Sequence, residues 1–213
     1  MLVTDIQEFK KRYCRVWLDG EIAFVLYKGD LRHYGIYEGM EMDEALYEAI
    51  LREVLSPRAQ KRALHLLEKR DYTSAGLKKK LLDGGYPEEI AQMAVESMKS
   101  YHYLDDERYA DQYIRCYVGR KSRMEICHKL SAKGIDREII DRVYELYKAE
   151  GNEDDEEAVV VRLLRKRHYY GESVEKKEID RHIAYLVRKG FSVSCIKKAI
   201  RILQEEYEST DGE

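Results

Sequence analysis

The chain has 213 residues and a formal net charge of −3, and 37% of its residues are charged. This length can bury a core, and the near-balance of charges excludes a polycation that binds nucleic acid through bulk charge. Apolar runs are short, so we expect no membrane span and no signal-peptide core. The four cysteines lack the close pairing of disulfide-rich domains, which favours a reducing, cytoplasmic setting.

The N-terminal residues predict a β-hairpin. Arg12–Leu18 and Glu21–Tyr27 are rich in aromatic and β-branched residues, and Asp19-Gly20 between them suits the positive φ angles of a type I′ turn. Beyond the hairpin we expect three further elements: a turn at 28–30, a short third strand at 31–34 and a helix at 43–55.

From Ser56-Pro57 onward, where we expect a capped helix to begin, the sequence repeats one pattern. A glycine followed by an aromatic or aliphatic residue recurs at Gly85, Gly134 and Gly190, each just past a predicted helix, where glycine adopts positive φ without a Cβ penalty. An acidic helix start at 105–107 also returns at 154–157. A period of about fifty residues indicates tandem helical units that complete one another's cores.

The sequence therefore predicts a mainly α protein with three tandem three-helix repeats in an elongated array, preceded by a small N-terminal β-hairpin and helix. We expect a hairpin-plus-helix segment at 1–55, repeats at 56–103, 104–151 and 152–208, and a flexible tail at 209–213. The predicted helices of the last two repeats span 105–118, 122–132, 136–149, 153–168, 174–189 and 192–207. The third repeat has a longer first connection, at 168–175.

The sequence offers little for catalysis, since it contains no nucleophile elbow, phosphate-binding loop, dinucleotide turn or zinc-protease motif. Consecutive helical residues point in different directions, so we interpret Asp105, Asp106 and Glu107 as capping residues rather than metal ligands. Zinc bound by Cys116, Cys127 and His128 is disfavoured because the spacing fits no closed site. We expect no enzyme activity, no cofactor and no metal.

Two groups of side chains are candidates for binding. Tyr109, Tyr113 and Tyr117 recur every four residues and form one stripe of a helix. Such a stripe can stack on exposed bases or pack between units with its hydroxyl groups at the rim, and packing is the favoured interpretation.

Basic residues gather where the first helix of each repeat ends. Helix-dipole compensation explains one such cluster, but clusters in all three repeats indicate an exposed basic ridge that binds phosphates or an acidic protein groove. The three clusters are Lys69 with Arg70, Arg120 with Lys121 and Arg123, and Arg165 with Lys166 and Arg167.

The chain resembles the RecX family. The resemblance rests on Leu104-Asp105-Asp106-Glu107-Arg108-Tyr109-Ala110, on Lys133-Gly134-Ile135, and on Lys80-Leu81 with Gly85-Tyr86. RecX proteins regulate the RecA recombinase, and the resemblance covers about residues 10–208. It implies a non-enzymatic regulator, acting in DNA repair, homologous recombination and the SOS response, that binds the RecA filament on single-stranded DNA and mostly inhibits it.

We therefore expect a monomer that binds the RecA filament, and possible direct contacts with single-stranded DNA. The alternative is a helical nucleic-acid-binding module that acts without a recombinase. A generic helical scaffold is a third interpretation, since it needs only the fold.

Overall fold

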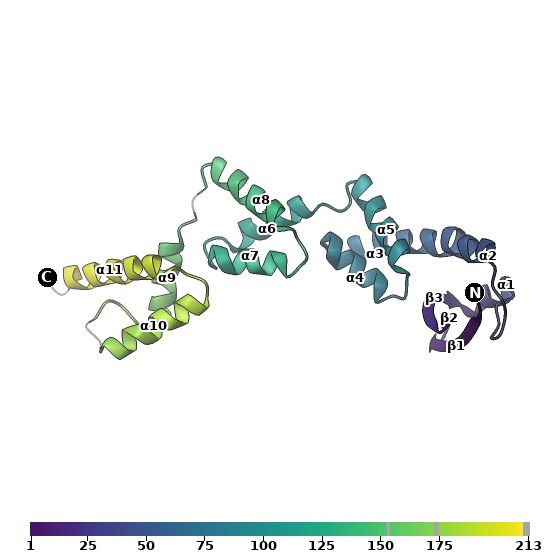
Figure 1. The fold of residues 1–213 in the computed structure, drawn as a ribbon. Coiled ribbons are helices and arrows are strands. Elements are labelled where there is room, and N and C mark those ends of the chain that lie inside the picture. Colours follow the sequence, from purple (N-terminus) through teal and green to yellow (C-terminus); the bar gives the residue numbers. More distant parts are fainter. Residues whose placement is uncertain (153, 173–174, 211–213) are drawn as a thin grey trace. The chain divides into compact units, whose positions relative to one another are not determined.

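The computed structural model describes residues 1–152, 154–172 and 175–210. The chain is divided into two compact units, one of residues 1–105 and one that begins at Asp106 (Figure 1). The predicted fold class is confirmed, because the described chain is mostly helical and carries its strands at the N-terminus. The elongated arrangement and the segment boundaries stay predictions.

A three-stranded antiparallel sheet opens the first unit, in the order β1 (Val3–Lys10), β2 (Tyr13–Leu18) and β3 (Glu21–Tyr27). The predicted hairpin is β2–β3, and both residues of its turn have positive φ, 52° at Asp19 and 89° at Gly20. β1 was not predicted. It pairs along β2 from Val3 opposite Leu18 to Lys10 opposite Tyr13, so the sheet has one more strand than the predicted hairpin.

Residues 28–34 do not form the predicted turn and third strand; they form helix α1 (Lys28–His33). The Asp30 carboxylate accepts a hydrogen bond from the Tyr27 backbone N–H at 2.9 Å and so fixes the first turn. The same carboxylate binds the Arg58 guanidinium in bidentate fashion, at 2.5 and 2.8 Å. This ion pair joins α1 to a helix 28 residues further along the chain, and local sequence patterns do not reveal it.

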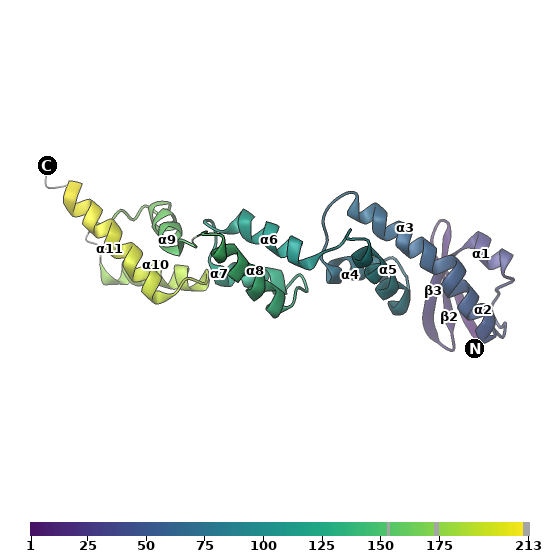
Figure 2. The ribbon, with the colours of Figure 1, turned by 90° about the horizontal axis from the view of Figure 1, so that it is seen from above.

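The prediction at Ser56-Pro57 is right in position but wrong about the cap: an α-helix begins at Ser56 with Pro57 in its first turn, but Ser56 does not cap it. Helix α2 (Glu44–Ala49), a π-helical turn (Ile50–Leu55) and helix α3 (Ser56–Leu67) follow one another without a break (Figure 2). Ser56 is itself helical, and its N–H bonds to the Leu51 carbonyl five residues earlier. Pro57 has no N–H to donate, and the wider π turn just before it accommodates the proline inside a continuous helix.

Helices α4 (Ser74–Leu82) and α5 (Glu88–Ser100) complete the first unit. Thr73 caps α4 by accepting a hydrogen bond from the Gly76 N–H at 3.0 Å. One hydrophobic core runs through the sheet and the helices of this unit; it includes Val16, Leu26, Ile50, Leu55, Ala63, Leu77, Ile90 and Met98.

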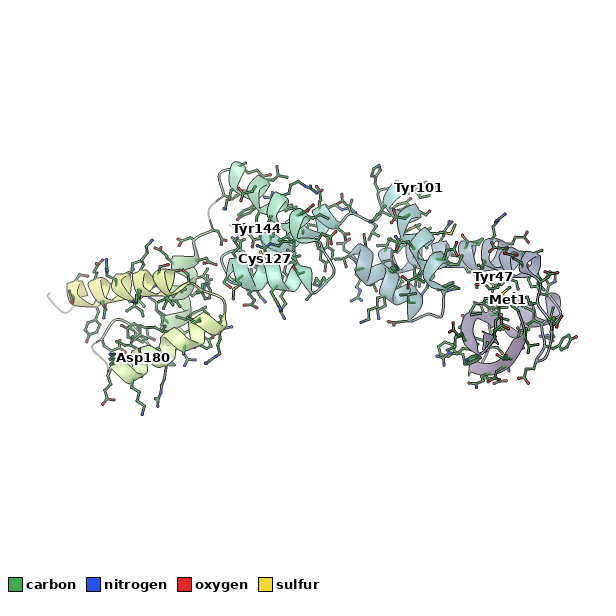
Figure 3. All side chains as sticks on the ribbon, in the orientation of Figure 1. Met1, Tyr47, Tyr101, Cys127, Tyr144 and Asp180 are labelled. Carbon is green, nitrogen blue, oxygen red and sulfur yellow. The ribbon has the colours of Figure 1, made fainter. Side chains whose placement is uncertain are left out.

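The second unit holds two three-helix repeats. Their helices are α6 (Asp106–Tyr117), α7 (Arg123–Ser131), α8 (Arg137–Ala149), α9 (Glu156–Arg165), α10 (Lys176–Arg188) and α11 (Val193–Thr210). Each repeat has its own core; that of the second repeat contains Tyr144 and Cys127 (Figure 3). Helix α11 continues into the predicted tail as far as residue 210. The predicted helix starts at 153 and 174, and residues 211–213, lie outside the described residues.

The three glycines predicted to follow helices have positive φ, 87° at Gly85, 80° at Gly134 and 90° at Gly190. Two histidines occupy the same left-handed conformation after α5 and α9, with φ of 58° at His102 and 62° at His168. The glycine pattern is therefore confirmed at all three positions, and the two histidines mark helix ends that carry no glycine signal.

The long connection of the third repeat is anchored on α11. Tyr169 is only 2% exposed and packs in the core of this repeat. Gly171 has φ of 105°, and a Cβ atom there would lie 2.1 Å from the Leu203 carbonyl oxygen. Glycine is required because the connection passes directly against the backbone of α11.

The start of α7 is fastened to the third repeat. Ser122 is fully buried; its hydroxyl donates to the Lys189 carbonyl at 2.6 Å and accepts from the Glu125 N–H at 3.1 Å. The Arg123 N–H donates to the Glu156 carboxylate at 2.7 Å. We call these residues the α7 junction. They join the second and third repeats through the Ser122 hydroxyl and through the Arg123 N–H, which has no partner within its own helix.

Candidate interaction surfaces

One face of α6 combines tyrosine rings with lysine ammonium groups. Tyr109, Tyr113 and Tyr117 are partly buried and pack against the core of the second repeat; the rings of Tyr113 and Tyr117 lie 4.4 Å apart. The Lys133 ammonium lies 5.6 Å from the Tyr109 ring and 5.9 Å from that of Tyr113, and the Lys121 ammonium lies 5.0 Å from the Tyr117 ring. We call this set the α6 tyrosine face.

The stripe therefore packs, but it packs against the core of its own repeat, whereas the sequence analysis expected packing between units. It also carries positive charge over its rings. Cations over aromatic faces are held by the ring quadrupole, typically with about 0.5–1 kcal/mol at exposed sites. Such a surface offers planar apolar rings and ammonium donors together, which suits a partner that has both apolar and acidic groups.

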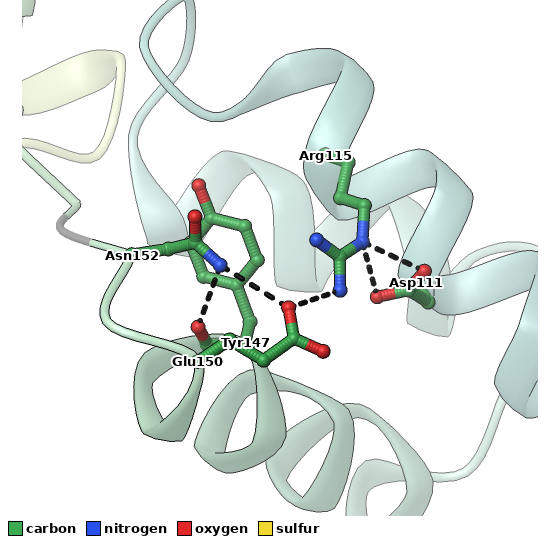
Figure 4. Close-up of polar contacts among 5 residues, drawn as sticks. All are labelled: Asp111, Arg115, Tyr147, Glu150 and Asn152. Atoms are coloured by element: carbon green, nitrogen blue, oxygen red, sulfur yellow. Dashed lines mark hydrogen bonds and ion pairs between the residues drawn. The ribbon is translucent and has the colours of Figure 1, made fainter.

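Arg115 on the same helix forms ion pairs within the second repeat. Its guanidinium binds Asp111 one turn earlier, at 2.8 Å to each carboxylate oxygen, and Glu150 after α8, at 2.6 Å (Figure 4). The Asn152 side chain donates to the Tyr147 carbonyl at 3.0 Å and to Glu150 at 3.2 Å. These contacts fix the end of α8 against α6, so Arg115 is already committed to local contacts.

The cluster after α6 is less exposed than the sequence analysis expects. Arg120 is exposed, and no ion pair links it to another described residue. Lys121 is 27% exposed and binds Glu125 at 2.6 Å. The Arg123 side chain is 35% exposed and lies over the Tyr144 ring at 4.6 Å, with Asp141 at 3.9 Å. Arg123 is thus turned toward the α7 junction because a buried ring and carboxylates attract it there.

The cluster after α9 is divided in the same way. Arg165 binds Glu206 of α11 at 2.5 Å, and Arg167 lies over the Tyr185 ring at 4.4 Å while its Nε donates to His182 at 3.3 Å. Lys166 is exposed and forms no ion pair with another residue that the structure describes. Arg167 likewise has no ion pair with a described residue, but Tyr185 and His182 hold its guanidinium. The exposed cations of the second unit's predicted clusters for which the described residues offer neither an ion pair nor such a ring contact are therefore Arg120 and Lys166.

In the first unit, Lys69 and Arg70 are exposed, and Arg70 lies over the Tyr72 ring at 4.5 Å. Whether the three clusters form one ridge stays a prediction, as do the proposed roles of their residues.

The sequence analysis missed a longer basic stripe on α3. Its members follow the helical spacing i, i+3, i+4 and i+7, opposite the buried alanines of the helix, and this spacing is the signal that identifies them. The members of the α3 cationic stripe are Arg58, Lys61, Arg62 and His65.

The ionisable groups of the core show no activated nucleophile. Burial raises the pKa of the Cys195 thiol to about 11 and raises the pKa of the Cys127 thiol as well, so both stay protonated at neutral pH. Burial, with the nearby Arg167 cation, lowers the pKa of His182. In the described part of the chain, no three histidine, cysteine, aspartate or glutamate side chains gather into a possible metal site.

Comparison with known proteins decides the family. A family model described as RecX, first three-helix domain, matches residues 59–98, and one described as RecX, second three-helix domain, matches residues 105–143. A regulatory protein RecX of Caldanaerobacter subterraneus subsp. tengcongensis is 31% identical over 211 residues, which is 95% of this chain and all of the relative. The chain belongs to the RecX family.

Further relatives agree with this assignment. A regulatory protein RecX of Clostridium acetobutylicum is 28% identical over 207 residues, 96% of this chain and 97% of the relative. A crystal structure of regulatory protein RecX has a TM-score of 0.58 and 25% identity, and the match covers 92% of this chain and 98% of that one. The RecX resemblance drawn from residues 104–110 is confirmed, and these relatives are named as regulators. None of the described helices has an apolar stretch that would reach across a bilayer.

Proposed function

We propose that this RecX-family chain binds the filament that RecA forms on single-stranded DNA and lowers its recombinase and co-protease activities, without chemistry of its own. Membership of a family of regulatory proteins carries the proposal, since 31% identity extends along 95% of the chain. The chain acts as a cytoplasmic monomer in recombinational DNA repair and the SOS response.

The α6 tyrosine face supports the proposal with a surface of suitable chemistry. Tyr113 and Tyr117 present neighbouring rings, and Lys121 and Lys133 lie beside the rings. Tyrosine is enriched where interfaces contribute most to affinity, because it buries a large area while its hydroxyl keeps a polar partner. Arg120 next to this face adds an exposed cation that attracts an acidic groove.

The same face favours a rival proposal, a module that binds bare single-stranded DNA. Bases stack on aromatic side chains with about 1–3 kcal/mol per base, and lysines beside the rings would neutralise phosphates. The two proposals differ in whether the recombinase is needed for tight binding.

Inhibition kinetics test the regulator proposal. With increasing protein, RecA ATPase and strand exchange should fall to a plateau set by the ratio of protein to filament, because a binder without turnover acts stoichiometrically. A variant with Tyr113→Ala and Lys133→Glu should need more protein for the same inhibition. Irreversible loss of activity at trace amounts, or hydrolysis of nucleotide or DNA by the isolated protein, would refute stoichiometric binding.

A further inference from the structure

The first unit contains a pocket of about 480 Å³ between the sheet, α3 and the turn from α4 to α5. Tyr13 and Tyr27 come from the sheet, and Gly85 and Tyr86 form the opposite side. A Cβ atom on Gly85 would lie 2.2 Å from the Val25 side chain, so the turn approaches the sheet as closely as glycine permits. The volume falls in the range of small-ligand sites, roughly 300–1,000 Å³.

The α3 cationic stripe lines this pocket. Among the described residues that line it, none is an aspartate or a glutamate. The charge of Arg58 is neutralised by Asp30, which does not line the pocket and whose carboxylate oxygens lie 2.5 and 2.8 Å from the guanidinium nitrogens. The His65 ring nitrogen lies 3.5 Å from the Glu68 carboxylate. Lys61 and Arg62 are exposed, and neither forms an ion pair with any residue in the described part of the chain. Two positive charges at the pocket are therefore available to an anion.

The hydroxyl groups of the pocket add uncharged donors. The Tyr13 and Tyr27 oxygens lie 3.0 Å apart, and only one of their two protons occupies the shared hydrogen bond. The second proton is available to a ligand. That hydrogen bond raises the pKa of Tyr27, and burial raises the pKa of Tyr86, so both phenols keep their protons at neutral pH. Because its side chains are rich in donors and lack carboxylates, the pocket selects a ligand with many acceptor oxygens.

We propose that this pocket binds the phosphate monoester and the base of a nucleotide, either in a free nucleoside monophosphate or at the 5′-phosphorylated end of a single strand. Lys61 and Arg62 match the two charges of a phosphate monoester, whereas a single carboxylate would leave one cation uncompensated. Tyr86 and the aliphatic side chains of Val25 and Leu55 give the base an apolar surface. The site is independent of the proposed binding to RecA.

Titration calorimetry tests the site with four probes: AMP, adenosine, inorganic phosphate and a 5′-phosphorylated thymidine pentamer. AMP or the pentamer should bind more tightly than adenosine or phosphate, because the site holds both parts of a nucleotide. Tighter binding of the pentamer assigns the site to a strand, and equal or tighter binding of AMP assigns it to a free nucleotide. Inorganic phosphate that binds as tightly as both nucleotide probes contradicts the proposal.

Charge reversal locates the binding. A variant with Lys61→Glu and Arg62→Glu should lose at least about tenfold in affinity for the preferred probe. Lys79→Glu with Lys99→Glu is the control, because it makes the same change in charge at exposed residues of this unit outside the pocket. A variant with Lys61→Gln and Arg62→Gln repeats the test without new acidic groups, and the single tryptophan, Trp17, reports whether the unit is folded.

Three further results would overturn the proposal. One is the absence of binding by AMP and by the pentamer at millimolar concentration to the wild-type protein. Another is equal affinity of the folded Lys61→Gln, Arg62→Gln variant and the wild type. The third is displacement of the nucleotide probe by a glutamate-rich peptide at lower concentration than AMP itself needs, which would assign the pocket to an acidic protein segment.

Discussion

The Ser122 hydroxyl donates to the Lys189 carbonyl at 2.6 Å and at the same time caps α7. One buried side chain thus serves a helix start in the second repeat and a helix end in the third. Both groups are ones that a helix leaves without an intrahelical partner. The junction of the two repeats is therefore built from helix ends that satisfy each other.

Replacing Ser122 with alanine should destabilise the second unit by about 2 kcal/mol, since it removes a cap and a buried hydrogen bond worth about 1 kcal/mol each. Asp155→Ala is the matched control, because Asp155 caps α9 through the Ala158 N–H at 2.9 Å in the same unit. The control should cost about 1 kcal/mol. Urea unfolding followed by circular dichroism measures both, and equal losses in the two variants would contradict the role of Ser122 at the junction.

Gly190 tests the close approach at the same junction. A Cβ atom there would lie 2.6 Å from the Ser122 hydroxyl and 3.0 Å from Met124, in addition to the positive φ of 90°. Gly119 also has positive φ, 73°, but a Cβ atom there meets nothing within 4 Å. Gly119→Ala should cost about 1 kcal/mol and Gly190→Ala about 2–4 kcal/mol in unfolding free energy. Similar melting curves for the two variants would show that the repeats do not meet at Gly190.

Asp154 lines a hollow with Arg123 and Glu156 of the α7 junction, and it should make the second unit more stable in mild acid. Burial raises the pKa of Asp154 above its ordinary value of 3.8, although the Arg123 and Lys148 cations oppose the shift. The folded state therefore holds this proton more tightly than the unfolded state, and the resulting stability is lost as the pH rises through the folded pKa. Burial raises the pKa of Glu156 in the same direction.

The variant Asp154→Asn should then raise the unfolding free energy at pH 7, and the gain should disappear below about pH 4, where the wild-type carboxyl is protonated in both states. Asp180→Asn is the control, because Asp180 is exposed on α10 and forms no ion pair with another described residue. Denaturant titrations across pH measure the difference. A loss of stability in Asp154→Asn at pH 7 would show that the carboxylate, not the neutral acid, stabilises the junction.

Much of this fold was predictable because its signals are local. The Asp19-Gly20 turn and the glycines that follow helices act through φ angles, which neighbouring residues do not alter. β1 was missed because Thr4, Asp5, Gln7 and Glu8 dilute its apolar pattern. α1 was missed because the partner of Asp30 is Arg58, which is brought near only by the folded chain.

The candidate surfaces were predictable to a smaller degree. Arg123 was predicted to be an exposed binding residue because it follows Arg120 and Lys121 in the sequence. In the structure its guanidinium lies over the Tyr144 ring at the α7 junction. The α3 cationic stripe has helical spacing rather than adjacency, so its members are separated along the chain, and only the folded first unit shows that they share a pocket with Tyr13 and Tyr27.

A variant with Arg120→Glu and Lys166→Glu should bind the RecA filament about tenfold or more weakly at low salt. Its thermal stability should change little, since both residues are exposed and form no ion pair with another described residue. Lys129→Glu with Lys177→Glu makes the same change in charge at other exposed positions of this unit. The wild type should also show the steeper dependence of binding on salt. Unchanged binding by the Arg120, Lys166 variant would remove these residues from the interface and leave the α6 tyrosine face as the next candidate.

Co-sedimentation with RecA tests the proposed function most directly. The protein is mixed with RecA assembled on single-stranded DNA with a slowly hydrolysed nucleotide, with the bare DNA, or with RecA alone. We predict that it enters the pellet with the assembled filament, saturates at a fixed ratio to RecA, and binds long bare DNA at least about tenfold more weakly. Failure to sediment with the filament, or equal affinity for bare DNA, would contradict the proposal that this chain regulates RecA by binding its filament.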